Sequence, residues 1–380
     1  LAPENWTPPA SIDEASTGTP ISIERIDLAE LSRERSAVAA ARAFQPWSWR
    51  GAVAGMSAYD EALAPVVTPT VMDRHGLTAV TIVAPDWPFL ETGAEHGLSA
   101  VIDRHRQRAD RLDLVFTQAC PGLGSCLLDR PLVDRLAHRS RRGLLGPLLV
   151  YQPDLPQADP IALDTNVQAP HRIRVASIRA TADSARQLAL LDHALASLAT
   201  DEPDGESLVR AIQQATVNLA GELPPMHIVL ETSTRMKGDD DATLSMSMVE
   251  TLFSQLNDWS SFGDIALTMV GASDPLQHDR LGEIIEMARE VGILAVHVRT
   301  DLRNATDEAV DGLIAAGADV ISVDFDHDES RPAALPAGGA PPVPHVDDPL
   351  VMQRLQRIIS GRRHISGPVN TGAIALPWIV

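Results

Sequence analysis

Asp86 is the first residue of the chain whose type and setting suggest chemistry. It follows the short β-branched run Thr78–Ala84 and stands in the stretch Pro85-Asp86-Trp87-Pro88. An aspartate at the carboxyl end of a strand can ligate Mg²⁺, and a proline close behind it fixes the turn. Asp86 is therefore a candidate magnesium ligand, and a purely structural turn is the alternative interpretation.

Four more aspartates, in the second half of the chain, each follow an apolar run. If the runs are strands of a βα barrel, their carboxyl ends form its working face, where converging carboxylates raise one another's pKa or recruit a divalent cation. The alternative is that they cap helices, which begin at the same ends, in a chain with a net charge of −20. The four residues are Asp240, Asp274, Asp301 and Asp324.

The overall composition excludes several classes of function. The 51 acidic against 31 basic residues argue against binding to nucleic acids or anionic membranes. No apolar run reaches the roughly 18 residues that a membrane span needs. Lys237 is the only lysine and stands in no phosphate-loop motif. Cys120 and Cys126 are too few for a disulfide scaffold or a Cys₄ metal site, and they indicate a reducing compartment, the cytoplasm.

The first half of the chain predicts an α/β domain over residues 20–200, preceded by a flexible leader, residues 1–19, rich in Pro, Ser and Thr. Three short apolar runs favour strands, and residues 93–108 carry apolar residues at helical spacing between the first two. Strand, helix and strand in this order imply a right-handed crossover and a parallel sheet. The predicted strands are Thr78–Ala84, Leu112–Thr117 and Leu148–Tyr151.

The second half predicts part of a (β/α) barrel. Breaks at Asp201–Gly205 and Pro224-Pro225 mark a helical linker over residues 201–224, and residues 225–380 form the second domain. Four βα units then follow one another along the chain. The predicted strands are His227–Glu231, Ile265–Val270, Leu294–Val298 and Val320–Val323, and the predicted helices are Ser247–Leu256, Leu276–Val291 and Asp307–Ala316.

The stretch Thr81–Leu90 resembles the strand and D-x-P-F-L turn of nucleotidyltransferases that activate sugars and cofactors. The resemblance implies that Asp86 binds the Mg²⁺ of a nucleoside triphosphate, so the ligands it suggests are Mg²⁺ and a nucleotide or another small molecule. The family also has a glycine-rich loop that ends in arginine. Residues 1–78 hold no such loop, and this departure counts against nucleotide binding.

The second half resembles the core of radical S-adenosylmethionine enzymes. The strand His227–Glu231 leads into Thr232-Ser233-Thr234-Arg235, where that family has its "TTR" stretch and cluster loop. Gly271-Ala272-Ser273-Asp274 stands where the family has the turn that holds the methionine end of the cofactor. The resemblance implies a partial barrel and a vestigial cofactor turn made of these four residues.

The same alignment places Met236, Asp240 and Thr243 at the three cluster-binding positions, and none of them is a cysteine. We therefore expect no [4Fe–4S] cluster and no cleavage of S-adenosylmethionine. Together the two halves resemble a spiro-SPASM-type protein, in which a nucleotidyltransferase-like α/β sheet precedes a radical-SAM-type partial barrel.

Three functions follow as hypotheses. The favoured one is a radical-SAM-like protein that has lost its cluster ligands and serves as a non-catalytic scaffold or binding module. The second is a Mg²⁺-dependent nucleotidyltransferase that works through Asp86. The third is a cation-dependent barrel enzyme that uses the ring of aspartates.

Overall fold

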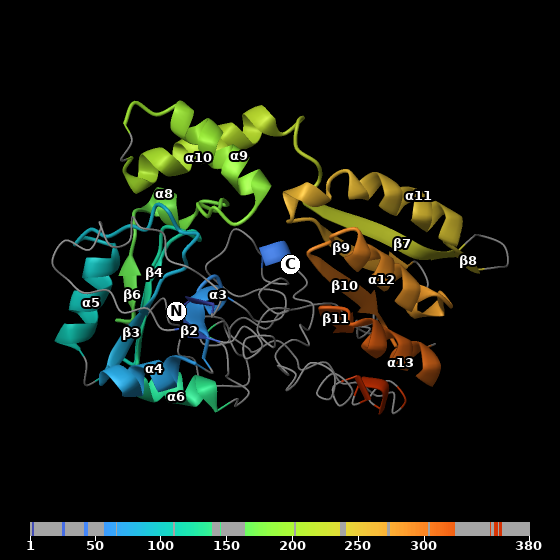
Figure 1. The fold of residues 1–380 in the computed structure, drawn as a ribbon, viewed down its shortest axis with the longest axis horizontal. Helices are drawn as coiled ribbons and strands as arrows, with labels where there is room; N and C mark the ends of the chain where they lie inside the picture. Colours follow the sequence, from blue (N-terminus) through green and yellow to red (C-terminus); the bar gives the residue numbers. More distant parts are fainter. Residues whose placement is uncertain are drawn as a thin grey trace, which may run out of the picture.

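The computed structural model describes residues 57–138, 164–235 and 241–323, with short gaps at 66, 109–110, 201–202, 272–273 and 303–304. It also describes a few separate short pieces, of which residues 42–44 matter most below; the others are 2–3, 25–26, 145, 350, 353–355 and 357–358. The chain is a mixed α/β protein with two main sheets, shown in Figure 1. Among the helices described, none is long and apolar enough to cross a membrane.

The first sheet has the strand order β3-β5-β4-β6. Strands β3 and β4 point the same way, as predicted, but β5 lies between them and is antiparallel to both. The expected purely parallel sheet is therefore wrong for this half, because a strand of four residues that the sequence pattern missed returns between the two. The strands are β3 (Ala79–Ile82), β4 (Leu114–Gln118), β5 (Cys126–Asp129) and β6 (Asn166–Gln168).

Alternating side chains of the first sheet pack against helices on its two faces. Val115 and Leu127 meet helix α5 (Leu98–Gln107) through Val101. On the other face, Leu114, Phe116 and Leu128 lie in one core with apolar residues of the remaining helices. Those helices are α3 (Asp60–Leu63), α4 (Thr68–His75) and α6 (Arg130–Ala137). The predicted third strand, Leu148–Tyr151, lies outside the described residues.

A helical pair, α9 (Ala185–Ala196) and α10 (Gly205–Leu219), follows the first sheet and, with the short helix α8 (His171–Arg174), forms a third buried cluster. Ser184 and Asp204 cap the N-termini of α9 and α10 with their side chains. The interruption between the two helices falls where the sequence predicts a break. Because α10 shares its core with α9 and with Cys120 and Leu123 of the first half, it packs as part of that half.

The second sheet has the order β11-β10-β9-β7-β8. The strands β11, β10, β9 and β7 are parallel and are joined by α11, α12 and α13 in succession, as the βα rhythm predicts. β8 is antiparallel to β7 at the edge. The strands are β7 (His227–Arg235), β8 (Asp241–Thr243), β9 (Ala266–Gly271), β10 (Ala295–Thr300) and β11 (Val320–Val323).

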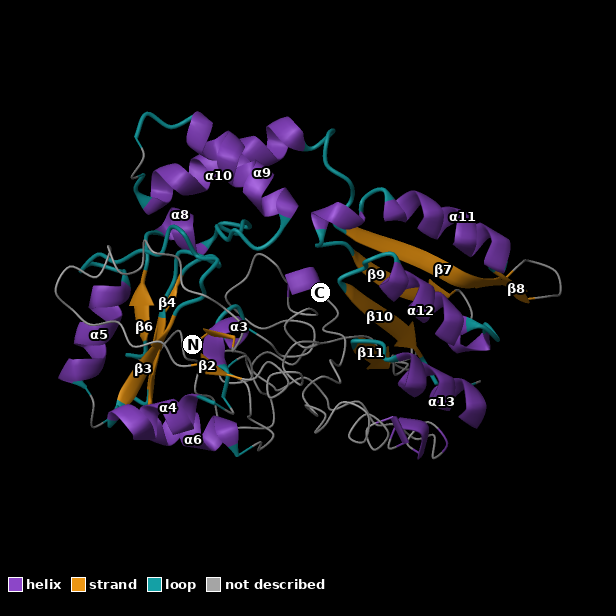
Figure 2. Cartoon of the chain, in the orientation of Figure 1, coloured by secondary structure: helices purple, strands orange, loops and turns teal. Residues whose placement is uncertain are grey.

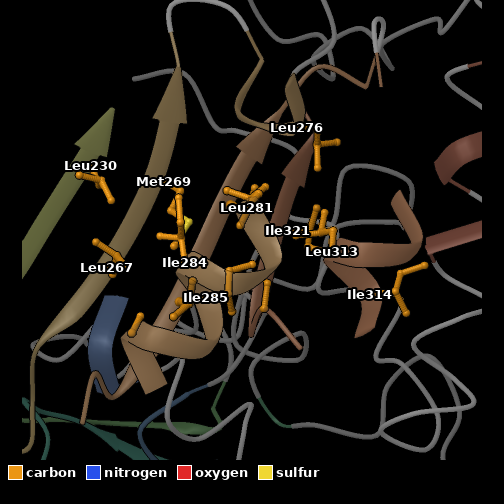
Figure 3. Close-up of a cluster of buried hydrophobic side chains, with 14 of the residues drawn as sticks. Leu230, Leu267, Met269, Leu276, Leu281, Ile284, Ile285, Leu313, Ile314 and Ile321 are labelled. Atoms are coloured by element: carbon orange, nitrogen blue, oxygen red, sulfur yellow. The ribbon is translucent and has the colours of Figure 1, made fainter. Parts of the chain in front are cut away.

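The helices α11 (Met246–Asn257), α12 (Leu281–Glu290) and α13 (Asp307–Ala316) cover one face of this sheet (Figure 2). Figure 3 shows Leu267 and Met269 of β9 meeting Ile284 and Ile285 of α12 in that core. The predicted helix Leu276–Val291 is instead two pieces. A 3₁₀ turn, η3 (Pro275–Gln277), precedes α12. The opposite face of the sheet carries the polar residues discussed below.

Candidate functional site

Asp86 lies in the turn just after β3, as predicted. Its side chain is only 16% exposed, and its Oδ2 lies 3.3 Å from Nη2 of Arg42, which forms an ion pair with it. Burial raises the pKa of Asp86; the Arg42 guanidinium offsets part of that increase, and the neighbouring Asp183 carboxylate adds to it. The backbone carbonyl of Asp86 accepts a hydrogen bond from the N–H of Ala182 at 2.7 Å, which fastens the loop before α9 to this turn.

Asp183 is the partner that the sequence did not indicate. Its Oδ1 accepts hydrogen bonds from Arg179 Nη2 at 2.9 Å and from Thr181 Oγ1 at 3.0 Å. Its Oδ2 lies 3.7 Å from Nη1 of Arg42. Asp183 stands directly before the capping residue of α9, so in the sequence it is indistinguishable from an ordinary residue at a helix start. Only the fold brings it to Asp86.

The residues around Asp86 do not fit a magnesium site while Arg42 is in place. Asp164, another aspartate of the first half, lies on the surface and binds Arg108 at 2.7 Å. In the described part of the chain, no three His, Cys, Asp or Glu side chains come together as metal ligands. The Arg42 guanidinium lies beside the Asp86 carboxylate and would repel a divalent ion bound there.

The two cysteines are buried in separate cores of the first half. Burial raises the pKa of Cys120 to about 12 and that of Cys126 well above its usual value. Both therefore stay as thiols at neutral pH, and a buried thiol is a weak nucleophile. Cys120 is therefore a small core residue.

The carboxylate of Asp274, another predicted site residue, accepts four hydrogen bonds. Its Oδ1 accepts a hydrogen bond from the N–H of Leu276 at 2.8 Å, which caps η3. Its Oδ2 accepts hydrogen bonds from the N–H groups of Asp301 at 2.9 Å and Leu302 at 3.1 Å, and another from the Thr300 hydroxyl. The 5% exposed carboxylate thus ties the turn after β9 to the end of β10.

Burial raises the pKa of Asp274, and the Asp301 carboxyl raises it further, against the lowering effect of the Thr300 hydroxyl and of the N–H groups that it binds. The backbone N–H of Asp301 binds the Asp274 carboxylate, so these two members of the predicted ring lie next to each other. Asp240 and Asp324, the other two members, lie outside the described residues, as do Ala272 and Ser273 of the cofactor turn. The four-member ring stays a prediction.

The turn that resembles a cofactor site is also fastened from β7. Ser233 donates its hydroxyl to the carbonyl of Asp274 at 3.2 Å, and Thr232 donates to the carbonyl of Val270 at 3.2 Å. Gly271 ends β9, where its register with Ser233 shifts. Thr243, which the resemblance aligns with a cluster ligand, pairs with Ser233 in the β7–β8 hairpin, whereas Met236 and Asp240 fall outside the described residues.

A row of polar side chains crosses the face of the second sheet opposite α11, α12 and α13. Hydrogen bonds join His227 Nε2 to Thr268 Oγ1 at 2.7 Å, Thr268 to His297 Nδ1 at 3.3 Å, and His297 Nε2 to Ser322 Oγ at 2.8 Å. The ring of Phe44 packs edge-on against both histidines, with centroids 5.6 and 5.5 Å away. The row lies toward the amino ends of β9 and β10, away from the predicted working face.

We expect His297 to titrate near pH 4. Burial, together with charge repulsion from His227 and Arg299, lowers its pKa to about 4. A depressed histidine pKa contributes stability that is present above pH 6.5, the ordinary value, and is lost as the pH falls toward 4. Titration of the ring resonances by NMR tests this value. Denaturant unfolding of the wild type and of His297→Gln, each at pH 6.5 and at pH 4, should show a smaller loss of stability on acidification in the variant. A His297 pKa at or above the ordinary value would contradict the expectation.

Comparisons with known proteins add no assignment to this geometry. No family model, no curated protein and no solved structure matches the chain.

Proposed function

We propose that this chain is a radical-SAM-like protein that has lost its cluster chemistry and works as a non-catalytic scaffold or small-molecule binding module. The observation that carries the proposal is that residues of the chain itself hold the turn around Asp274 in place. The chain's own Ser233, Thr300, Asp301 and Leu302 bind this turn through hydrogen bonds. A turn held in this way serves the packing of β7, β9 and β10.

Four consecutive parallel strands with helices on one face support the partial-barrel part of the proposal. The alignment leaves no thiolate at the cluster positions, and the two thiols of the chain are buried in the other half. Since a [4Fe–4S] cluster is held by cysteine thiolates, residues of this chain offer it no site. A fold of this kind can persist without the chemistry of its relatives.

The two alternative functions have less support from the described contacts. A nucleotidyltransferase would need Asp86 free for a metal-bound nucleotide, and Asp86 pairs with Arg42. A cation-dependent barrel enzyme would need the Asp274 carboxylate, which already accepts four hydrogen bonds.

Anaerobic reconstitution with iron and sulfide is expected to leave the wild-type chain without stoichiometric iron. It should also show no broad absorption at about 400 nm, where thiolate-bound clusters absorb. With S-adenosylmethionine and a strong reductant, it should form no 5′-deoxyadenosine. Iron analysis, absorption spectra and chromatography of the nucleoside products measure these outcomes.

The matched control is a triple variant, Met236→Cys, Asp240→Cys and Thr243→Cys, reconstituted in parallel. Iron taken up by the triple variant alone would support the alignment of these positions and the loss of function by substitution. Stoichiometric iron in the wild-type chain, or cofactor cleavage by it, would sink the proposal.

A further inference from the structure

We infer that the guanidinium of Arg42 is the resident cation of the carboxylate pair Asp86–Asp183 and excludes a divalent metal ion from it. The resemblance to nucleotidyltransferases puts Mg²⁺ at Asp86, and the described contacts put an arginine there. The inference concerns the first half of the chain and is independent of the cluster loss in the second.

One guanidinium serves both carboxylates. Nη2 of Arg42 lies 3.3 Å from Asp86 Oδ2, and Nη1 of the same group lies 3.7 Å from Asp183 Oδ2. The carboxylates reach this point from distant segments, Asp86 from the turn after β3 and Asp183 from the loop before α9. Two carboxylates that approach one cation in this way have the layout of a bridged metal site, with a planar +1 group in place of the ion.

The buried oxygen of Asp183 is an independent sign that the pair is built for a cation. The Asp183 side chain is 2% exposed, and among the described residues its Oδ2 has no hydrogen-bond partner. The other oxygen is already bound by Arg179 and Thr181. A buried carboxylate oxygen without a donor is costly unless a positive charge lies close to it. Arg42 supplies that charge, although at a distance beyond a hydrogen bond.

The charge balance explains why a metal ion is excluded. Within the described ion pairs, Asp86 and Asp183 supply two negative charges and Arg42 and Arg179 two positive ones, so the charges of these four groups balance. A divalent ion added to it would face two guanidinium groups. Without Arg42 the cluster keeps one uncompensated negative charge and an open position between two carboxylates, the ligands that Mg²⁺ and Mn²⁺ prefer.

The second half of the chain anchors the residues next to Arg42. Ala43 is buried against Ala266 of β9 and Ala295 of β10, and Phe44 packs on His227 and His297. In Figure 1 this segment is the short blue helical turn between the two sheets. The cation of the Asp86–Asp183 pair is therefore carried by a segment that the other sheet holds in position.

The experiment measures Mn²⁺ binding, by the loss of the free-ion EPR signal and by calorimetry, in the wild type and in variants of the cluster. We expect no saturable site at millimolar Mn²⁺ in the wild type and one site in Arg42→Ala. Adding Asp183→Asn to Arg42→Ala should remove that site. Mn²⁺ should also raise the melting temperature of Arg42→Ala by several degrees and leave that of the wild type unchanged.

Two controls make the test specific to the positive charge at position 42. Arg42→Lys keeps a positive charge in the chain and should still exclude Mn²⁺. Arg108→Ala removes the arginine from the exposed pair with Asp164 and should gain no Mn²⁺ site, which separates a built pair from loss of any arginine.

Two results would overturn the inference. One is a wild-type Mn²⁺ site that Asp86→Asn abolishes, because the metal would then bind with Arg42 present. The other is a folded Arg42→Ala, as judged by circular dichroism, that binds no Mn²⁺. If Arg42→Ala does not fold, the wild type and Arg42→Lys decide the question. Mn²⁺ binding at Asp86 in either protein would contradict exclusion by the cation.

Discussion

Asp274→Ala is expected to lower the free energy of unfolding by about 3 to 5 kcal/mol, because it leaves several buried donors without an acceptor. The carboxylate accepts from the backbone N–H groups of Leu276, Asp301 and Leu302 and from the Thr300 hydroxyl. An unsatisfied buried donor typically costs about 1 to 3 kcal/mol. Urea unfolding followed by circular dichroism at neutral pH measures the difference.

Asp204→Ala is the matched control for this prediction. Asp204 caps α10 on the surface, where its carboxylate accepts from the backbone N–H of Ser207 at 2.9 Å and from the Ser207 hydroxyl at 2.7 Å. Loss of such a cap costs about 1 kcal/mol. If Asp274→Ala costs no more than Asp204→Ala, Asp274 acts as a helix cap alone and does not hold the turn to β10.

Asp274→Asn should also destabilise the protein, by less than alanine does. Both carboxylate oxygens accept hydrogen bonds, so an amide would point its NH₂ group at a donor in either orientation. This variant distinguishes a need for two acceptors from a need for side-chain volume. An Asp274→Asn protein as stable as the wild type would show that one acceptor is enough.

The sequence predicts the second sheet well and the first less well, for a physical reason. In β7, β9, β10 and β11 the apolar runs alternate with helices whose spacing is clear, and consecutive parallel strands must then lie side by side. In the first sheet, β5 is a four-residue strand, Cys126–Asp129, directly before α6. Its short apolar run carries no period of its own, so its place between β3 and β4 is determined by packing alone.

The candidate site shows the same limit. Asp86 could be singled out because a strand and a proline surround it. Its partners Arg42 and Asp183 come from segments 44 residues before it and well after it, and nothing local marks either of them. Asp274 could be placed at a strand end, but the sequence could not tell a metal ligand from a carboxylate that binds Thr300 and the N–H groups next to it. Pairings between distant segments depend on tertiary structure, which local patterns do not encode.

The second prediction with a large effect concerns the buried ion pair that joins the two halves. Arg186 of α9 donates from Nε to Asp264 Oδ2 at 2.8 Å, and both side chains are 4% exposed. Asp264 lies just before β9, and the Arg186 guanidinium also stacks over the ring of Phe262 at 5.5 Å. Ser184 adds a hydroxyl to the same Asp264 oxygen at 3.3 Å.

Asp264→Ala is expected to destabilise the protein by about 3 to 5 kcal/mol, since it leaves the Arg186 charge buried without its partner. The double variant Arg186→Met with Asp264→Leu should cost clearly less than Asp264→Ala, because an apolar pair of similar volume removes both desolvation penalties. Urea unfolding of the wild type, Arg186→Met, Asp264→Leu and the double variant completes a double-mutant cycle. Additive losses would contradict a coupled pair.

The same pair connects α9 with the segment before β9, so it should also affect the cooperativity of unfolding. We expect fluorescence and circular dichroism to follow one coincident transition in the wild type and two separate transitions in Asp264→Ala. That result would show that this contact makes the two halves unfold as one unit.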